Sequence, residues 1–96
     1  MNNDNLESYY PGDDDWHRFA ILFVDEWSTC QFQNELLLAV NNDKEIAAVI
    51  YGSVWQNSLQ WIDEPMPALN NRTPRQCIET EDGRKRLKTM LMRMPR

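Results

Sequence analysis

The sequence contains few of the residues from which small enzymes and metal proteins build their sites. It has one histidine, two cysteines and three glycines in 96 residues. The cysteines lack the paired spacing of a zinc or redox motif, and so few glycines leave no loop that could cradle a phosphate. The single histidine has no serine or cysteine partner visible in the sequence. We therefore expect no enzyme activity, no bound metal and no cofactor.

Long hydrophobic runs are also absent. No apolar stretch approaches the ~20 residues that a membrane-spanning helix needs, and the polar start MNNDN does not resemble a secretion signal. In such a chain Cys30 and Cys77 are best explained as buried, reduced thiols, ahead of a disulfide or a redox role. The sequence therefore predicts a cytoplasmic protein that does not bind a membrane through a spanning helix.

Two polar features near the N-terminus could suggest chemistry, but each has a simpler explanation. His17 lies in an acidic first helical turn, where a surface or capping role is favoured over general-base catalysis. The run from Asp13 to Asp15 lacks the spaced ligands and the glycine of a calcium-binding loop, so we interpret it as a solvated helix cap.

The net charge of -5 is unevenly distributed along the chain. Residues 1–42 hold eight acidic residues and one basic residue, whereas residues 43–96 hold seven acidic and nine basic residues. Residues 83–96 contain six lysines or arginines and no acid. We therefore divide the chain into an acidic N-terminal segment, residues 1–42, and a second region, residues 43–96, with a basic end.

Helical periodicity predicts an all-α fold of about five to six short helices. The first helix is expected over residues 16–28, where apolar residues recur at helical spacing on one broad face that is core rather than a ligand site. The members of this stripe are Trp16, Phe19, Ala20, Phe23 and Trp27. Further apolar residues at positions 21, 22 and 24 indicate that this helix is central or covered by a partner.

Capping signals set the boundaries of the remaining helices. A helix over residues 33–40 should end at Asn41 and Asn42, and the next, over residues 44–51, should be capped by Asp43 and end at Gly52. Ser53 and Gln56 have the spacing of a capping box for a helix over residues 54–62.

Beyond Pro65 and Pro67, which forbid helix, we expect an ordered loop. Thr73 and Gln76 repeat the capping-box spacing around a short helix over residues 74–79. Thr80 should cap the last helix.

The basic end of the chain allows three interpretations. It could be a solvated face, a surface for a protein partner, or a patch that binds nucleic acid or an anionic membrane. The chain is acidic overall and its aromatic residues lie elsewhere, which argues against nucleic acid.

The second region resembles a known family, the toxin-binding domain of Xre/MbcA/ParS-type antitoxins. The resemblance covers roughly residues 43–96 and depends on an ordered set of positions. These are Trp61-Ile62, Pro65, Ala68-Leu69, Arg72-Thr73-Pro74, Cys77-Ile78, Gly83, Leu87, Leu91 and Met94. Asn70-Asn71 stands where the family has a Gly-Gly pair, and asparagine tolerates the left-handed backbone that such a turn needs.

This resemblance implies an antitoxin of a bacterial toxin–antitoxin system. Its partner would be a RES-type toxin, which consumes NAD, and the antitoxin would neutralise it by docking on it, without catalysis of its own. The resemblance suggests six residues for the contact with the toxin: Leu69, Arg72, Arg93, Met94, Pro95 and Arg96. Because the chain ends at Arg96, docking is expected rather than plugging of the toxin's active-site cleft.

Members of this family usually carry an N-terminal helix-turn-helix that binds DNA. Residues 1–42 are short and acidic, so they should repel phosphate, and DNA binding is not expected here. We expect this segment to pack on the second region or to mediate self-association as a homodimer. Two alternatives to the antitoxin remain: an orphan helical interaction module, and a small adaptor that binds nucleic acid or membrane through its basic C-terminal helix.

Overall fold

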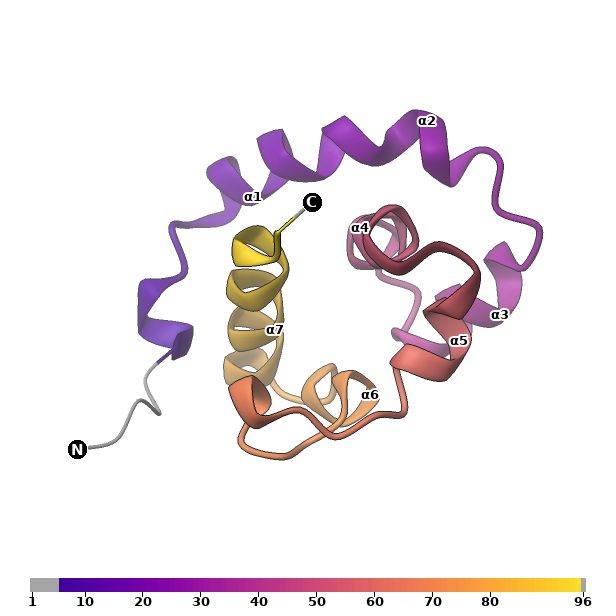
Figure 1. Cartoon of the computed structure of the whole chain (residues 1–96). Coiled ribbons are helices and arrows are strands. Elements are labelled where there is room, and N and C mark those ends of the chain that lie inside the picture. Colours follow the sequence, from indigo (N-terminus) through magenta and orange to yellow (C-terminus); the bar gives the residue numbers. More distant parts are fainter. Residues whose placement is uncertain (1–5, 96) are drawn as a thin grey trace.

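Helix α4 (Lys44–Val54) lies at the centre of the fold in the computed structural model, which describes residues 6–95 (Figure 1). Its residues Ile46 to Tyr51 are all buried. A helix that is apolar on every side must be covered on every side. The other helices accordingly surround α4, and the fold is all-α as predicted.

The described chain contains helical segments and no strand. Before α4 these are η1 (Leu6–Tyr9), α1 (Asp13–Ala20), η2 (Ile21–Phe23), α2 (Val24–Trp27) and α3 (Gln33–Ala39). After α4 come η3 (Trp55–Asn57), α5 (Ser58–Trp61), η4 (Pro67–Leu69), α6 (Pro74–Cys77) and α7 (Glu81–Arg93), where η marks a 3-10 helix. None of these helices combines the length and apolar character needed to cross a bilayer.

The N-terminal segment forms an arc over α4 and α7 (Figure 1). The helix predicted over residues 16–28 is here divided into α1, η2 and α2, and it begins earlier, at Asp13. Gly12 is the N-cap, and the three aspartates that we expected to supply the cap lie in the first turn, where their charge complements the helix dipole. The arc is therefore a bent helix that follows the surface of the core.

The inner face of the arc carries the predicted aromatic stripe. Trp16, Ala20, Phe23 and Trp27 are buried, and Phe19 is partly buried against them, which confirms the prediction of core residues. Ile21, Leu22 and Val24 are exposed on the other side.

Gly52 allows the arc to approach α4 closely. A Cβ atom at this position would lie 2.2 Å from Cδ1 of Phe23. Because contacts of this length do not occur, the ring of Phe23 can pack on α4 only where the side chain is missing.

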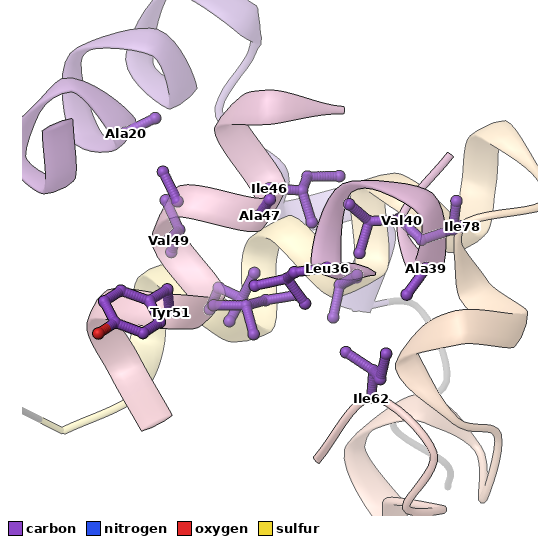
Figure 2. Close-up of a cluster of buried hydrophobic side chains, with 14 of the residues drawn as sticks. Ala20, Leu36, Ala39, Val40, Ile46, Ala47, Val49, Tyr51, Ile62 and Ile78 are labelled. Atoms are coloured by element: carbon purple, nitrogen blue, oxygen red, sulfur yellow. The ribbon is translucent and has the colours of Figure 1, made fainter. Parts of the chain in front are cut away.

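Residues from both ends of the chain share one hydrophobic core. Leu36 and Val40 lie beside Ile46, and Ile62 and Ile78 belong to the same cluster (Figure 2). Trp16 and Leu91 extend this core to the first and last long helices. Cys30 and Cys77 are free thiols within the buried set, as predicted, and burial raises the pKa of both.

Three predicted helix starts are confirmed. Asp43 accepts a hydrogen bond from the amide of Ile46 (3.1 Å), and Thr80 accepts one from the amide of Gly83 (2.9 Å). Thr73 and Gln76 form a complete capping box, in which each side chain accepts from the other residue's amide.

The capping box predicted for Ser53 and Gln56 is wrong. Helix α4 continues through Gly52 to Val54, and the hydroxyl of Ser53 donates to the carbonyl of Val49 (2.7 Å) inside the helix. Serine can form this bond without leaving a helix, so its spacing to Gln56 did not mark a helix start. The chain turns instead at Trp55, which has a positive φ of 55°.

Gly83 provides a test of the junction between α6 and α7. A Cβ atom there would lie 2.2 Å from the carbonyl oxygen of Cys77, a backbone atom that cannot rotate away. We predict that Gly83→Ala lowers the free energy of unfolding by about 2 kcal/mol, although alanine is the better helix former. Urea denaturation measures this change. In the control Lys85→Ala, which removes a partly exposed ion pair with Glu81, the loss should stay under about 0.5 kcal/mol. An unchanged or stabilised Gly83→Ala protein would contradict the steric argument.

Candidate partner-binding site

The loop between α5 and α6 is held in one conformation by its own backbone. The amide of Met66 donates to the carbonyl of Arg72 (3.1 Å), and the amide of Asn71 donates to the carbonyl of Met66 (2.8 Å). Asn70 and Asn71 have φ angles of 58° and 62°, which confirms that asparagine adopts the left-handed turn. The loop is therefore a preformed platform.

Leu69 does not present its side chain on this platform. It is 0% exposed and belongs to the hydrophobic core, because η4 turns it inward. The side chain that we expected to contact a partner is therefore not accessible in this structure. Its role in the structure is to anchor the loop to the hydrophobic core.

Arg72 and Arg75 stabilise the conformation of the loop, Arg72 from within it and Arg75 by joining its two ends. Arg72 is half-buried, and its Nε donates to the carbonyl of Leu69 (3.2 Å). Arg75 makes two hydrogen bonds to the carboxylate of Asp63 (2.8 and 3.2 Å), and these bonds lower the pKa of Asp63. Arg72 thus braces the loop, whatever further contact its side chain makes.

The remaining candidates lie at the C-terminal end of α7. Arg93, the last residue of the helix, is exposed, as is Pro95, while Met94 is half-buried against the core. Arg96 lies outside the described residues. The structure therefore separates the candidates into two groups, one in the loop and one at the end of α7.

These two groups lie at different levels along α7. The loop contacts the helix through Arg86, whose Nε donates to the carbonyl of Ala68 (2.7 Å). Seven residues further on, or about 10 Å along the helix axis, lies Arg93. A contact that uses Arg93 is therefore not automatically a contact with the loop.

The basic residues of α7 are mostly engaged within the protein. Arg86 is only 3% exposed; besides Ala68, its guanidinium donates to Glu7 (2.8 Å) and to the side-chain oxygen of Asn70 (3.4 Å). Arg86 is one of the six cations of the basic end, and the structure buries it. Because Arg86 is buried, α7 presents fewer exposed cations than its sequence suggests.

Aromatic residues of the N-terminal segment cover two further cations. The ammonium of Lys88 lies 5.5 Å from the ring centre of Tyr10 and 5.3 Å from that of Trp16. The guanidinium carbon of Arg93 lies 5.1 Å from the ring centre of Tyr9. Distances of this size are those of cation–π contacts. Residues 7–16 therefore act as a strap along α7, and we use that name for them below.

Glu7, the first residue of the strap, has a lowered pKa. Its pKa is lowered by a hydrogen bond from its own backbone amide and, further, by the hydrogen bond and charge of Arg86. The ionised carboxylate is thus the form that the folded protein stabilises.

Sequence reasoning missed Glu7, Tyr9 and the buried state of Arg86. One signal was available for Arg86, because it lies three residues after Gly83 and four before Met90 and so falls on the inward face of the helix. No local signal identifies its partner Glu7, which is 79 positions away.

His17 is exposed, as predicted, and its Nδ1 pairs with the Glu45 carboxylate (2.6 Å). The pair lies at a groove of about 550 Å³ between the arc and α4. Within the described residues no three His, Cys, Asp or Glu side chains gather as a metal site.

Comparison with known families gives one match. Residues 50–95 match the family described as "Antitoxin Xre/MbcA/ParS C-terminal toxin-binding domain", which is just under half of the chain. The match includes the loop, α6 and α7, and it excludes the strap. No curated protein and no solved structure matches the chain.

The buried contacts of Arg86 should make it important for the stability of the fold. Replacing it with alanine removes its hydrogen bonds to Ala68, Glu7 and Asn70, leaves the Glu7 carboxylate without this partner and opens a cavity. Arg86→Ala should therefore lower the free energy of unfolding by about 3 kcal/mol. Chemical denaturation measures the change. The matched control is Arg93→Ala, an exposed cation of the same helix, which loses one exposed cation–π contact and should cost about 1 kcal/mol or less. Equal losses in the two variants would contradict a structural role specific to Arg86.

Glu7 gives a prediction about pH. Since its pKa is lower in the folded protein than the usual 4.5, the ionised form adds stability above pH 4.5, and this stability is lost as the pH falls through the folded-state value. Glu7→Gln should therefore be less stable than wild type at pH 7, by about 1 kcal/mol, with the difference shrinking below about pH 4.5. Unfolding titrations of both proteins from pH 7 to pH 3 test this. The pKa of Asp63 is lowered too, but it affects both proteins equally, so a pH-independent difference would count against the Glu7 assignment.

Proposed function

Since residues 50–95 carry a toxin-binding domain of the Xre/MbcA/ParS antitoxin family, we propose that this protein is an antitoxin that binds and neutralises a cognate toxin. The family match is the observation that carries the proposal. The partner we propose is a RES-type, NAD-consuming toxin, because the loop and α7 resemble the toxin-binding domain of antitoxins that act on such toxins. The antitoxin acts as a stoichiometric binding protein and performs no catalysis.

The exposed end of α7 is the proposed contact. Arg93 forms no ion pair with any described acidic residue, and Pro95 follows it in an exposed, extended segment. Met94 joins this end of the chain to the core, so the position of Arg93 is fixed before a partner arrives. We propose that residues 93–96 dock beside the active-site cleft of the toxin and obstruct access for NAD, while Arg72 supports the loop.

Binding of nucleic acid or an anionic membrane is the less supported alternative. Such binding needs several free cations on one face. Arg86 is buried and Lys88 lies against two aromatic rings, while the adjoining strap is acidic at Glu7 and Asp13. Absence of salt-sensitive retention on heparin would remove this alternative.

The proposal predicts a complex with a RES-domain protein encoded in a neighbouring reading frame. Co-expressed and purified through a tag on the toxin, the two chains should elute together, and cells should keep their NAD only when the antitoxin is present. Arg93→Glu should weaken the complex at least about tenfold, since it opposes a charge at the contact. Lys44→Glu, a charge reversal at an exposed residue of α4, is the control and should bind like wild type. If the wild-type proteins form no complex and NAD is lost regardless, the proposed function is wrong.

A further inference from the structure

Tyr9 is a large exposed side chain beside the proposed contact. It ends η1, is 64% exposed, and its ring lies against the guanidinium of Arg93. Tyr9 belongs to the strap and not to residues 50–95, the part of the chain that matches the antitoxin domain. The two residues are 84 positions apart in sequence, yet they form one patch of surface.

The neighbours of Tyr9 on both sides are fixed to the protein. Two residues earlier, Glu7 pairs with the buried Arg86. On the other side the hydroxyl of Tyr10 donates to Asp13 (2.7 Å), and the Tyr10 ring lies beneath Lys88. The backbone at Tyr9 is thereby held while its side chain faces outward. Because the backbone at Tyr9 is already ordered, binding through Tyr9 loses less conformational entropy than binding through a flexible segment would.

The chemistry of the patch favours a carboxylate. A guanidinium that contacts a ring only through its charge keeps its N–H groups available, and these match the two oxygens of a carboxylate. Among the described residues, neither the Tyr9 hydroxyl nor the Arg93 guanidinium has a hydrogen-bond partner. Tyrosine and arginine are also the residue types that dominate the energetics of protein interfaces.

We propose that Tyr9 and Arg93 together form a seat for an acidic side chain of the toxin. This inference rests on the proposed function, and it extends the toxin-binding surface beyond the family domain to the strap. Tyr9 holds the guanidinium in place and donates from its hydroxyl to the same carboxylate. A protein carboxylate fits better than a polyanion, because Glu7 and Asp13 lie in the same strap and repel extended negative charge.

The test is a double-mutant cycle on the complex with the RES-domain protein of the neighbouring frame. Tyr9→Ala should raise Kd about tenfold, and Tyr9→Phe, which keeps the ring, about threefold. Adding Tyr9→Ala to Arg93→Ala should cause far less than a further tenfold loss, because the two side chains act as a unit. Isothermal titration calorimetry measures Kd, and the melting temperature of each variant reports folding.

Leu38→Ala is the matched control, since Leu38 is an exposed large side chain on α3, across the molecule from η1 (Figure 1). It should bind like wild type. Wild-type affinity for Tyr9→Ala, or full multiplication of the two single losses, would overturn the inference while leaving the proposed function intact. Failure of wild type itself to bind would overturn both, and the two failures are told apart by the wild-type titration.

Discussion

The buried guanidinium of Arg86 fixes the relative position of three segments that are distant in sequence. A charged group that is almost fully removed from water is tolerated only when it is paired and hydrogen-bonded. Here the partners are the carbonyl of Ala68 and the side chain of Asn70 from the loop, and the carboxylate of Glu7 from the strap. If any one of the three segments moves, Arg86 is left with unsatisfied donors. The loop, the strap and α7 are therefore mutually dependent.

This dependence gives part of the acidic N-terminal segment a structural role beside the basic end. The acidic N-terminal segment does not form a separate unit that repels the basic end; it lies along that end and supplies Glu7 and aromatic faces to its cations. The Asn-Asn pair in the loop takes part in the same arrangement. Glycine at position 70 would allow the left-handed turn, but only a side chain such as that of Asn70 can accept a hydrogen bond from Arg86.

The features that sequence reasoning predicted correctly are those that depend on a few neighbouring residues. The caps at Asp43, Thr73 and Thr80 form as predicted because each needs only a side chain and an amide two or three positions away. The left-handed asparagines and the aromatic stripe belong to the same class. All of these follow from local geometry and helical periodicity.

The incorrect predictions concern choices that tertiary packing decides. Ser53 has the spacing of a cap, but α4 continues because its apolar residues are buried on all sides. The bend of the arc at η2 lets Phe23 reach Gly52, a contact that no local pattern encodes. At the candidate site, packing buries the side chain of Leu69 in the core, whereas the exposure of Arg93 follows from its place at the helix end.

The division of the candidate residues along α7 has a consequence for the way a partner can bind. Helix α7 ends at Arg93, which lies beside Tyr9 of the strap, whereas the loop contacts the same helix seven residues earlier, at Arg86. The contact that we propose at Arg93 therefore includes Tyr9. The loop then contributes indirectly, because it holds Arg86, which holds Glu7, which positions Tyr9. In the proposed arrangement, residues of the range that matches the antitoxin family support the binding surface, and part of that surface comes from outside residues 50–95.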